Sequence, residues 1–447
     1  MNEKELAEKL NSDKATKIFA ELYGESGIDA ARKRYTTLIS DMLKDGNEWR
    51  DLRVFSAPGR TELAGNHTDH NCGKVLAASI QLDCVAVVKK RNDNIVFFRS
   101  TGFPDVRVKL TDSNGKPDLE PKQEEIGTTE ALIRGIAAEF HKRGCEAGGF
   151  SANADSAVLP GLGLSASAAL EVLLGRIFDS LYGGEKRTPL ELAQIGQIAE
   201  NDYFGKPCGL MDQTSCALGG AIVIDFEYHD DPAIKQINFD ITAAGFVLCV
   251  VNTGGSHAEL TDDYASIPSE MKSVAAFYSK SVLRELDKEK VLYRAPDLRK
   301  KLGDRALLRS IHFFDENERV YDMSIALQIM GKETSDAAKL DTFYVYLKMV
   351  NQSGDSSWKL LQNVYSPDNT SNQGISLALA LTKDFLANKC SNAGACRVHG
   401  GGFAGTIQAY IPISAINDYR ECIEEIFGAG AVTLLMIRPK GAVELFF

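Results

Sequence analysis

A short polar run at residues 58–71 combines one cation, two acids and several hydrogen-bonding side chains. The proline and glycine before Arg60 are expected to end regular structure there, and Gly65 lets the backbone turn again. In an extended segment His67 and Asp69 would share one face, because they are two residues apart. That face offers an imidazole and a carboxylate, a pair suited to sugar hydroxyls. A polar loop without chemistry is the alternative, since short motifs often match by chance.

A second stretch with chemical potential covers residues 159–169, LPGLGLSASAA. Gly161 and Gly163 permit close backbone approach to a ligand, and Ser165 and Ser167 are expected to open a helix. The free N–H groups and positive dipole end of a helix suit phosphate. Hydroxyls in the first turn can cap the helix or reach a magnesium ion. An ordinary glycine turn capped by serine is the alternative.

Two glycine runs also satisfy the loose dinucleotide-binding fingerprint, namely Gly161-x-Gly163-x-x-Ala166 and Gly400-x-Gly402-x-x-Gly405. They keep a nicotinamide-dependent oxidoreductase open as an alternative function. The first run follows Leu159-Pro160 rather than a clean apolar strand. The sequence contains no Gly-x-x-x-x-Gly-Lys-[Ser/Thr], so a Walker-type phosphate loop is not predicted.

A third stretch places an acid and an amide just after a bend. The glycines and proline at residues 205–209 should turn the chain before Asp212 and Gln213. Side chains fixed after such a bend are held where chemistry might need them. The alternative is that Asp212 merely caps a helix that begins at Gln213.

The first stretch resembles the galactokinase signature Gly-Arg-x-Asn-x-Ile-Gly-Glu-His-x-Asp-Tyr of the GHMP small-molecule kinases. It matches at five positions: Gly59, Arg60, Gly65, His67 and Asp69. It departs at four: Glu62 replaces Asn, Ala64 replaces Ile, Asn66 replaces Glu, and His70 replaces Tyr.

Three later runs are similar to the same family. The 159–169 stretch resembles Pro-x-Gly-x-Gly-Leu-Ser-Ser-Ser-Ala, with Ala166 in place of the middle serine. The run that ends at Gln213 resembles Ala-Glu-x-x-Phe-x-Gly-x-x-Cys-Gly-Ile-Met-Asp-Gln. His399 to Gly405 resembles Gly-Gly-Gly-Phe-Gly-Gly, with Ala404 replacing one glycine. The resemblance covers roughly residues 50–447.

The resemblance implies phosphoryl transfer from MgATP to the anomeric hydroxyl of a sugar, and it implies a role for each matching residue. The implied catalytic residues are Asp212 and Arg60. The implied substrate contacts are Asn66, His67, Asp69, Gly209 and Tyr264. The implied nucleotide contacts are Gly161, Gly163, Ser165, Ala166 and Ser167. Gly401 and Gly402 would lie near the transferring phosphate, and Ser167 and Glu200 would serve Mg²⁺.

Galactose is the expected substrate, with product galactose 1-phosphate. Position 66 leaves a second substrate open. The family's Glu would accept a hydrogen bond from the C6 hydroxyl and repel a C6 carboxylate, whereas the Asn66 amide can accept or donate. Galacturonate, or another galacto-configured sugar, is therefore the alternative. A catalytically silent sugar sensor on the same fold is disfavoured, because Arg60, Ser167, Glu200 and Asp212 are all present.

Composition excludes several other classes. The net charge of -11 argues against nucleic acid or an anionic membrane as partner. The nine cysteines include no Cys-x-x-Cys pair, which predicts neither a zinc site nor a disulfide framework and fits a reducing cytosol. The charged N-terminus lacks a signal-peptide core, and no apolar run is long enough to span a membrane. We expect a cytoplasmic enzyme that uses a small sugar and ATP; the oligomeric state is left open.

The elements that position these stretches alternate between strands and helices. Strands are expected at 54–57, entering the Arg60 loop, and at 75–88, 95–100, 106–110, 221–226, 237–241, 245–252 and 406–411. Helices are expected in 1–50, at 128–143 and through most of 270–390, with a loop at 351–357. A polar loop at 229–231 and the run 252–257 leading to Tyr264 complete the pattern.

The fold class implied by the resemblance is α+β, a two-lobed GHMP kinase fold with the active site in the cleft between the lobes. We predict an N-terminal helical arm at 1–50, an N-terminal lobe at 51–240 and a C-terminal lobe at 241–447.

Overall fold

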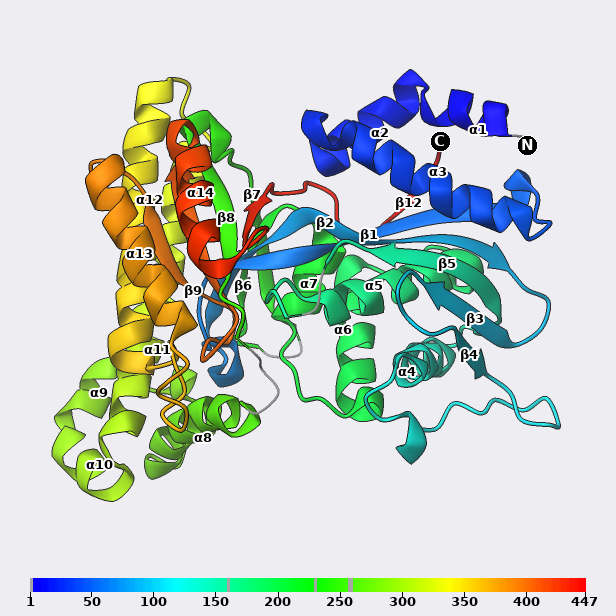
Figure 1. The fold of residues 1–447 in the computed structure, drawn as a ribbon. Helices are drawn as coiled ribbons and strands as arrows, with labels where there is room; N and C mark the ends of the chain where they lie inside the picture. The colour runs from blue at the N-terminus through cyan, green and yellow to red at the C-terminus, as the bar shows by residue number, and fades with distance from the viewer. Residues whose placement is uncertain (1–2, 159–160, 229–230, 256–259) are drawn as a thin grey trace.

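A computed structural model describes residues 3–158, 161–228, 231–255 and 260–447. Two β-sheets organise these residues (Figure 1). The larger sheet has the strand order β12-β1-β2-β5-β3-β4, and β6 and β7 extend it beyond the other half of β2. All its pairings are antiparallel except β3 with β5. Its strands are β1 (Leu52–Ala64), β2 (Lys74–Lys90), β3 (Ile95–Ser100), β4 (Val106–Lys109), β5 (Phe150–Ser156), β6 (Ala221–Asp225), β7 (Ala233–Ile237) and β12 (Val443–Leu445).

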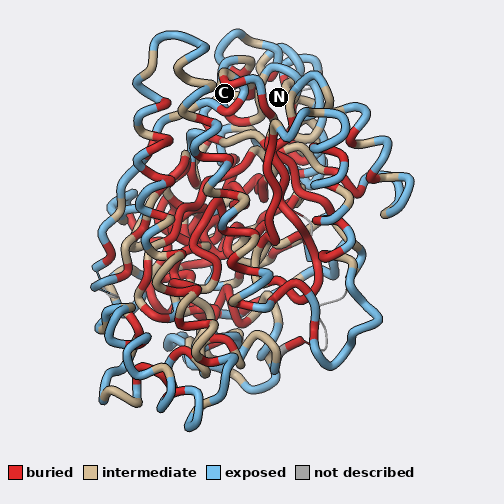
Figure 2. Tube along the Cα trace, turned by 90° about the vertical axis from the view of Figure 1, so that its left-hand side faces the viewer, coloured by how far each residue is buried: buried red, intermediate tan, exposed pale blue. Residues whose placement is uncertain are grey.

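Both faces of the larger sheet are buried, because helices cover each of them. Alternate residues of its strands point to opposite faces, so neighbouring residues enter different cores. Three N-terminal helices cover one face, where Val54 and Val87 enter their core. The helices between β4 and β6 cover the other face (Figure 1), where Phe55 and Val88 enter the main core. Figure 2 shows the buried residues gathered in the interior, with exposed residues around the outside. The first group is α1 (Glu3–Leu10), α2 (Asp13–Tyr23) and α3 (Ile28–Lys44); the second is α4 (Thr129–Lys142), α5 (Ala166–Phe178), α6 (Pro189–Ile198) and α7 (Met211–Leu218).

The smaller sheet is antiparallel and has the order β11-β8-β10-β9. One face packs against α13 and α14. On the other side α12 contacts β9, and the neighbouring α11 contacts β2 of the larger sheet. Its strands are β8 (Phe246–Asn252), β9 (Ala395–His399), β10 (Thr406–Pro412) and β11 (Val432–Leu435). The helices are α11 (Asp304–Met330), α12 (Asp336–Ser356), α13 (Gly374–Lys389) and α14 (Ile416–Phe427).

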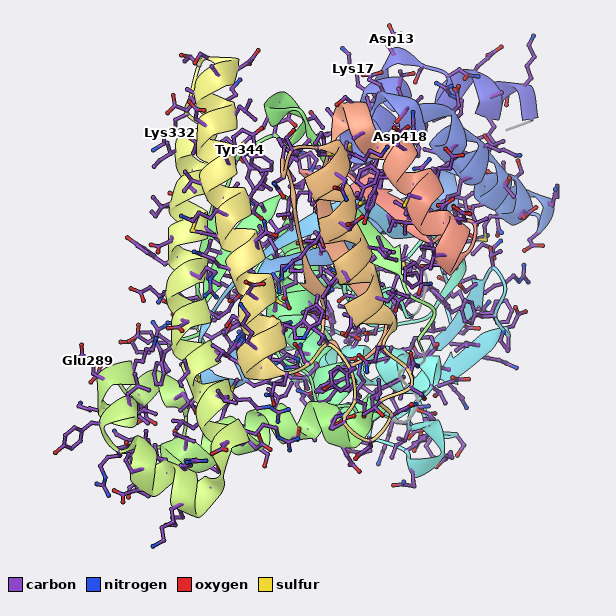
Figure 3. The ribbon with its side chains drawn as sticks, turned by 60° about the vertical axis from the view of Figure 1, so that its left-hand side comes forward. Asp13, Lys17, Glu289, Lys332, Tyr344 and Asp418 are labelled. Carbon is purple, nitrogen blue, oxygen red and sulfur yellow. The ribbon has the colours of Figure 1, made fainter. Side chains whose placement is uncertain are left out.

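Three further helices form a small cluster with its own apolar core, below the smaller sheet in Figure 1. They are α8 (Thr261–Phe277), α9 (Lys288–Tyr293) and α10 (Ala295–Leu302). Figure 3 shows Glu289 of α9 at this lower end and Lys332, which follows α11, at the upper end of the long helices. No described helix combines the length and apolarity needed to cross a bilayer.

The first strand differs from the prediction, because β1 continues through Arg60 to Ala64 instead of ending at Ala57. Its pairing with β2 shifts register between Pro58 and Arg60 and again after Glu62. Such bulges absorb a proline and a glycine without ending the strand. The segment after β1, in contrast, is not extended. His67 has a left-handed backbone, and Asp69 begins a 3₁₀ turn, so the predicted shared face is wrong.

Two other predicted elements are displaced. The loop expected at 351–357 is helical, because α12 runs to Ser356 and a π-helical turn follows at Ser357–Leu361. Its polar side chains face α11: Ser353 donates to Glu316, and Ser356 bonds His312. The strand expected at 237–241 is β7, which ends at Ile237. Parts of three predicted segments, at 159–160, 229–230 and 256–257, lie outside the described residues.

The three predicted domain ranges stay a prediction. The second sheet begins at β8, close to the predicted lobe boundary near residue 240. The last strand, β12, returns to pair with β1 of the larger sheet. The chain therefore does not divide into two lobes by sequence position alone.

Candidate active site

An arginine and an aspartate from opposite ends of the N-terminal half form the centre of the candidate site. Arg60 lies on β1, and Asp212 lies in the first turn of α7. Arg60 Nε and Nη2 donate to the two oxygens of Asp212, each at 2.8 Å. Burial disfavours the arginine charge, but Asp212 outweighs it and raises the pKa of Arg60. Ser165 also donates to Asp212, so the carboxylate is fixed from two sides.

The glycine stretch is attached to β1 beside this pair. The Arg60 guanidinium donates to the Gly163 carbonyl, and the Arg60 backbone N–H donates to Leu164 O at 3.1 Å. A Cβ atom on Gly59 would lie 2.6 Å from that Leu164 oxygen, so only glycine permits this approach. Ser165 has a φ of 60°, and α5 begins at Ala166. The first turn of α5 therefore presents its unpaired N–H groups next to the Arg60–Asp212 pair.

The predicted sugar-binding histidine and tyrosine lie against the third glycine run. His67 Nε2 donates to Gly401 O at 2.9 Å, and Tyr264 donates to Gly402 O at 2.9 Å. Burial lowers the pKa of His67 to about 4, so the imidazole is neutral at pH 7. Because Nε2 donates to a carbonyl, Nδ1 is left as the hydrogen-bond acceptor of the ring.

The glycines near these residues are required by close packing. A side chain at Gly209 would collide with the carboxylate of Asp69, and one at Gly401 would collide with the ring of Tyr264. Gly209 lies three residues before Asp212, so Asp69 is brought beside the segment that carries the aspartate. The structure thus assembles all four of the separate sequence stretches around one site.

Asn66 differs from the other predicted substrate contacts. His67 and Asp69 are partly accessible, whereas Asn66 is 1% exposed. Its Nδ2 donates to Gly400 O at 2.6 Å and to Glu62 Oε1 at 3.2 Å. Its Oδ1 accepts from Asn363 Nδ2 at 2.8 Å. The amide therefore bonds to protein groups behind the accessible surface.

The predicted metal side contains a second carboxylate that sequence reasoning missed. Glu200 is buried and accepts hydrogen bonds from Lys206 Nζ (3.1 Å) and Gln213 Nε2 (2.9 Å). The same Gln213 nitrogen donates to Glu171 Oε2 at 2.9 Å. Burial, followed by the neighbouring Glu200, raises the pKa of Glu171 well above its usual value. Glu171 lies one helical turn after Ser167 on α5, in an otherwise apolar run. An isolated acid in such a run is the sequence feature that could have identified Glu171 as a site residue.

These side chains offer oxygens of the kind that a magnesium ion shared with phosphates would need. Glu171 Oε1 is buried and has no protein hydrogen-bond partner. Among the described residues, no cluster of three or more histidine, cysteine or acidic side chains could hold a metal. Magnesium in phosphotransferases commonly takes only one or two carboxylates and completes its shell with phosphate and water. A hydroxyl and buried carboxylates of this kind match that requirement.

Several other residues of the site carried no local signal. Asn363 lies after α12, yet it donates to both Asn66 Oδ1 and Gly401 O. Glu62 pairs with Arg397, which lies on β9. Both partners are far from the first stretch in sequence, and only the fold brings them together.

Comparison with known proteins identifies two matching families. The description "GHMP kinases N terminal domain" matches residues 131–220, and "Galactokinase galactose-binding signature" matches residues 46–90. The galactokinase of Streptomyces coelicolor is 30% identical over 387 residues, 85% of this chain and 89% of the relative. That of Glaesserella parasuis is 28% identical over 381 residues, 83% and 88% of the two chains.

Solved structures share the fold. Lactococcus lactis galactokinase complexed with galactose superposes with a TM-score of 0.71 at 22% identity, covering 96% of this chain and 98% of that one. Methanococcus jannaschii mevalonate kinase gives a TM-score of 0.57 at 12% identity, with coverages of 86% and 98%. The predicted α+β GHMP kinase fold is confirmed.

Proposed function

This chain belongs to the galactokinase family of GHMP kinases and is a phosphotransferase, and we propose that it transfers the γ-phosphoryl group of ATP to the anomeric hydroxyl of galactose. The product is galactose 1-phosphate. The observation that carries the proposal is the two-point Arg60–Asp212 pair, which lies beside the glycine stretch and α5.

Asp212 and Arg60 are the proposed catalytic residues. Asp212 accepts or orients the proton of the C1 hydroxyl, and Arg60 neutralises charge on the transferring phosphoryl group. The contacts from Arg60 and Ser165 hold the carboxylate in one orientation. Because phosphoryl transfer depends mainly on positioning and charge stabilisation, a fixed carboxylate serves it well.

His67, Asp69 and Tyr264 are the proposed sugar contacts, with Gly209 giving room for Asp69. The neutral His67 accepts a hydrogen bond from one sugar hydroxyl at Nδ1, and the Asp69 carboxylate accepts a hydrogen bond from another hydroxyl. Their positions are fixed by Gly401 and by the segment before Asp212. Gly401 and Gly402 lie on the side of the transferring phosphate in this proposal.

The nucleotide and metal contacts are proposed from the glycine stretch and its helix. Gly161, Gly163, Ser165, Ala166 and Ser167 hold the phosphates of ATP. Ser167 and Glu200 hold Mg²⁺, which neutralises phosphate charge when bound. Glu171 stabilises the orientation of Gln213, whose amide bonds Glu200.

The other functions considered are less well supported. Membership of a kinase family argues against a nicotinamide-dependent oxidoreductase. The intact Arg60–Asp212 pair argues against a silent sugar sensor. Galacturonate stays the alternative substrate, since position 66 lacks the family's glutamate.

A phosphorylation screen tests the proposal. The purified protein is incubated with ATP, Mg²⁺ and a panel of hexoses and uronic acids, and ADP release is measured. We expect galactose to give the highest kcat/KM and ³¹P NMR to place the phosphate on C1. If kcat/KM were higher for galacturonate than for galactose, galacturonate would be the substrate. If the protein phosphorylated no galacto-configured sugar, the proposal would be contradicted.

A further inference from the structure

The first sequence stretch exchanges two side chains relative to the family signature. Glu62 occupies the position of the signature's asparagine, and Asn66 occupies that of its glutamate. The number of carboxylates is therefore conserved, but the carboxylate has moved by four residues. The two side chains also touch each other, because Asn66 Nδ2 donates to Glu62 Oε1 at 3.2 Å.

The relocated carboxylate is enclosed by protein. Glu62 is 4% exposed, and its Oε1 also accepts from Arg397, a fully buried side chain of β9. The carboxylate thus faces a cation inside the protein. A carboxylate at position 62 cannot serve as the acceptor that the signature's glutamate would offer to a sugar.

Asn66 cannot take over that task in its present position. Both amide hydrogens are used by Glu62 and Gly400, and Oδ1 accepts from Asn363. Its backbone is fixed as well, since His312 Nε2 donates to the Asn66 carbonyl at 2.9 Å. Rotation of the amide toward the sugar would break three hydrogen bonds of a buried group, which is costly.

We infer that Glu62 is a specificity-determining residue. Together with Arg397 it holds Asn66 away from the sugar, so that the side chain at position 66 makes no hydrogen bond with the C6 hydroxyl. The substrate class is then galacto-configured sugars with or without that hydroxyl, such as galactose and 6-deoxygalactose. The inference rests on the proposed function. A site that makes no polar contact with a hydroxyl does not reject the analogue that lacks it, because no buried partner is left unpaired.

Steady-state kinetics on the two sugars tests the inference. For the wild-type chain we expect kcat/KM for galactose and 6-deoxygalactose to agree within tenfold. The reciprocal variant Glu62→Asn/Asn66→Glu restores the signature's order of these two side chains, so that the acid stands at position 66 and Glu62 no longer holds that position. We expect its galactose preference to exceed that of the wild type by tenfold or more, as for loss of a charged hydrogen bond.

Asn66→Glu alone is the matched control. It adds a second carboxylate beside Glu62, and repulsion between the two acids leads us to expect a lower Tm than for the reciprocal variant. If this single change raised the galactose preference as far as the reciprocal variant without lowering Tm, position 66 alone would decide specificity and the inference about Glu62 would be overturned.

The remaining outcomes separate this inference from the proposed function. A wild-type preference for galactose above tenfold would overturn the inference while leaving the proposed function intact. That comparison needs no variant, so it holds even if the reciprocal variant fails to fold. An unchanged preference in a folded, active reciprocal variant would also overturn it. No turnover of either sugar by the wild type would overturn both.

Discussion

Two arginine–carboxylate pairs start from the same strand, two residues apart. Arg60 of β1 pairs with Asp212 of α7, and Glu62 of β1 pairs with Arg397 of β9. In the first pair the Asp212 side chain is 32% exposed. In the second pair the side chains of Glu62 and Arg397 are 5% and 0% exposed. The pairs are alike in chemistry and differ in enclosure.

Enclosure determines what each pair can do. Asp212 is held by Arg60 but is still accessible to a substrate, so its orientation can be used for positioning. Burial raises the pKa of Glu62, although the attraction of Arg397 opposes this shift. The removal of both charged groups from water therefore costs free energy, which their attraction offsets only in part. A buried pair contributes little when intact, but the loss of one partner leaves an uncompensated charge. We therefore expect changes to the first pair to affect turnover and changes to the second to affect stability.

The largest expected effect separates the two pairs by turnover. Asp212→Asn removes the proton acceptor and weakens the contact with Arg60, and we expect kcat to fall about a thousandfold with little change in Tm. Initial rates of ADP release and thermal melting measure both quantities. Asp341→Asn, at an exposed position of α12, is the control and should match the wild type. Near-normal turnover of Asp212→Asn would remove this residue from the mechanism.

The buried pair is tested by Arg397→Gln. Because Glu62 loses its cation in an enclosed environment, we expect the free energy of unfolding to fall by about 3–5 kcal/mol. Urea unfolding followed by circular dichroism measures this change. Glu62→Gln/Arg397→Gln, which removes both charges, should recover a large part of the loss. A loss below about 1 kcal/mol in the single variant would mean that the pair does not stabilise the fold.

A smaller effect is expected on the metal side. Glu200→Gln and Ser167→Ala each remove or weaken a hard oxygen ligand of the kind magnesium prefers. We expect the Mg²⁺ concentration for half-maximal activity to rise roughly 10–100-fold for Glu200→Gln and less for Ser167→Ala. Titrating Mg²⁺ at saturating sugar and ATP measures it. An unchanged magnesium dependence in both variants would show that the proposed metal ligands are wrong.

The smallest effect concerns His399, which lies between the two pairs and bonds the hydroxyls of Thr61 and Thr406. Burial, and then the charges of Arg60 and Arg397, lower the pKa of His399 well below its usual value. As pH drops below about 6.5, His399 is protonated in the unfolded chain but stays neutral in the folded chain. The stability of the folded state therefore falls. One such histidine accounts for about 1 kcal/mol of the loss between pH 7 and 5.5.

His399→Gln tests this pH dependence. Urea unfolding at pH 7 and pH 5.5 should show a stability loss smaller than that of the wild type by about 1 kcal/mol. The comparison uses the difference between two pH values, so a uniform destabilisation by the substitution cancels. An equal loss in both proteins would mean that His399 is protonated in the folded state.

Sequence patterns predicted the parts of this molecule whose causes are local. Glycine and serine spacing identified the start of α5, and apolar runs identified β2, β3, β4, β6, β8 and β10 within a few residues. The strands β5, β9, β11 and β12 were not predicted. Arg60 and Asp212, the two catalytic residues implied by the family resemblance and not by spacing, are in contact.

The errors arise where tertiary contacts outweigh local preference. Ser353 and Ser356 looked like loop residues, but hydrogen bonds to α11 accommodate them in a helix. The arginine that pairs with Glu62 and the asparagine that bonds Asn66 lie about 300 or more residues from those partners. No period or spacing in one sequence reports such pairings.

The return of β12 to the larger sheet has a consequence for biosynthesis. Val54 on β1 pairs with Leu445, and the C-terminal Phe447 ring lies 5.4 Å from Phe19 and 5.6 Å from Tyr35. At 5–20 residues per second, a ribosome makes Leu445 on the order of 20–80 s after Val54. The edge of β1 and the apolar face of the helical arm therefore stay partly uncovered until residues 443–447 have been synthesised. Because exposed apolar surface and unpaired strand edges promote aggregation, we expect this chain to need protection by chaperones during that interval.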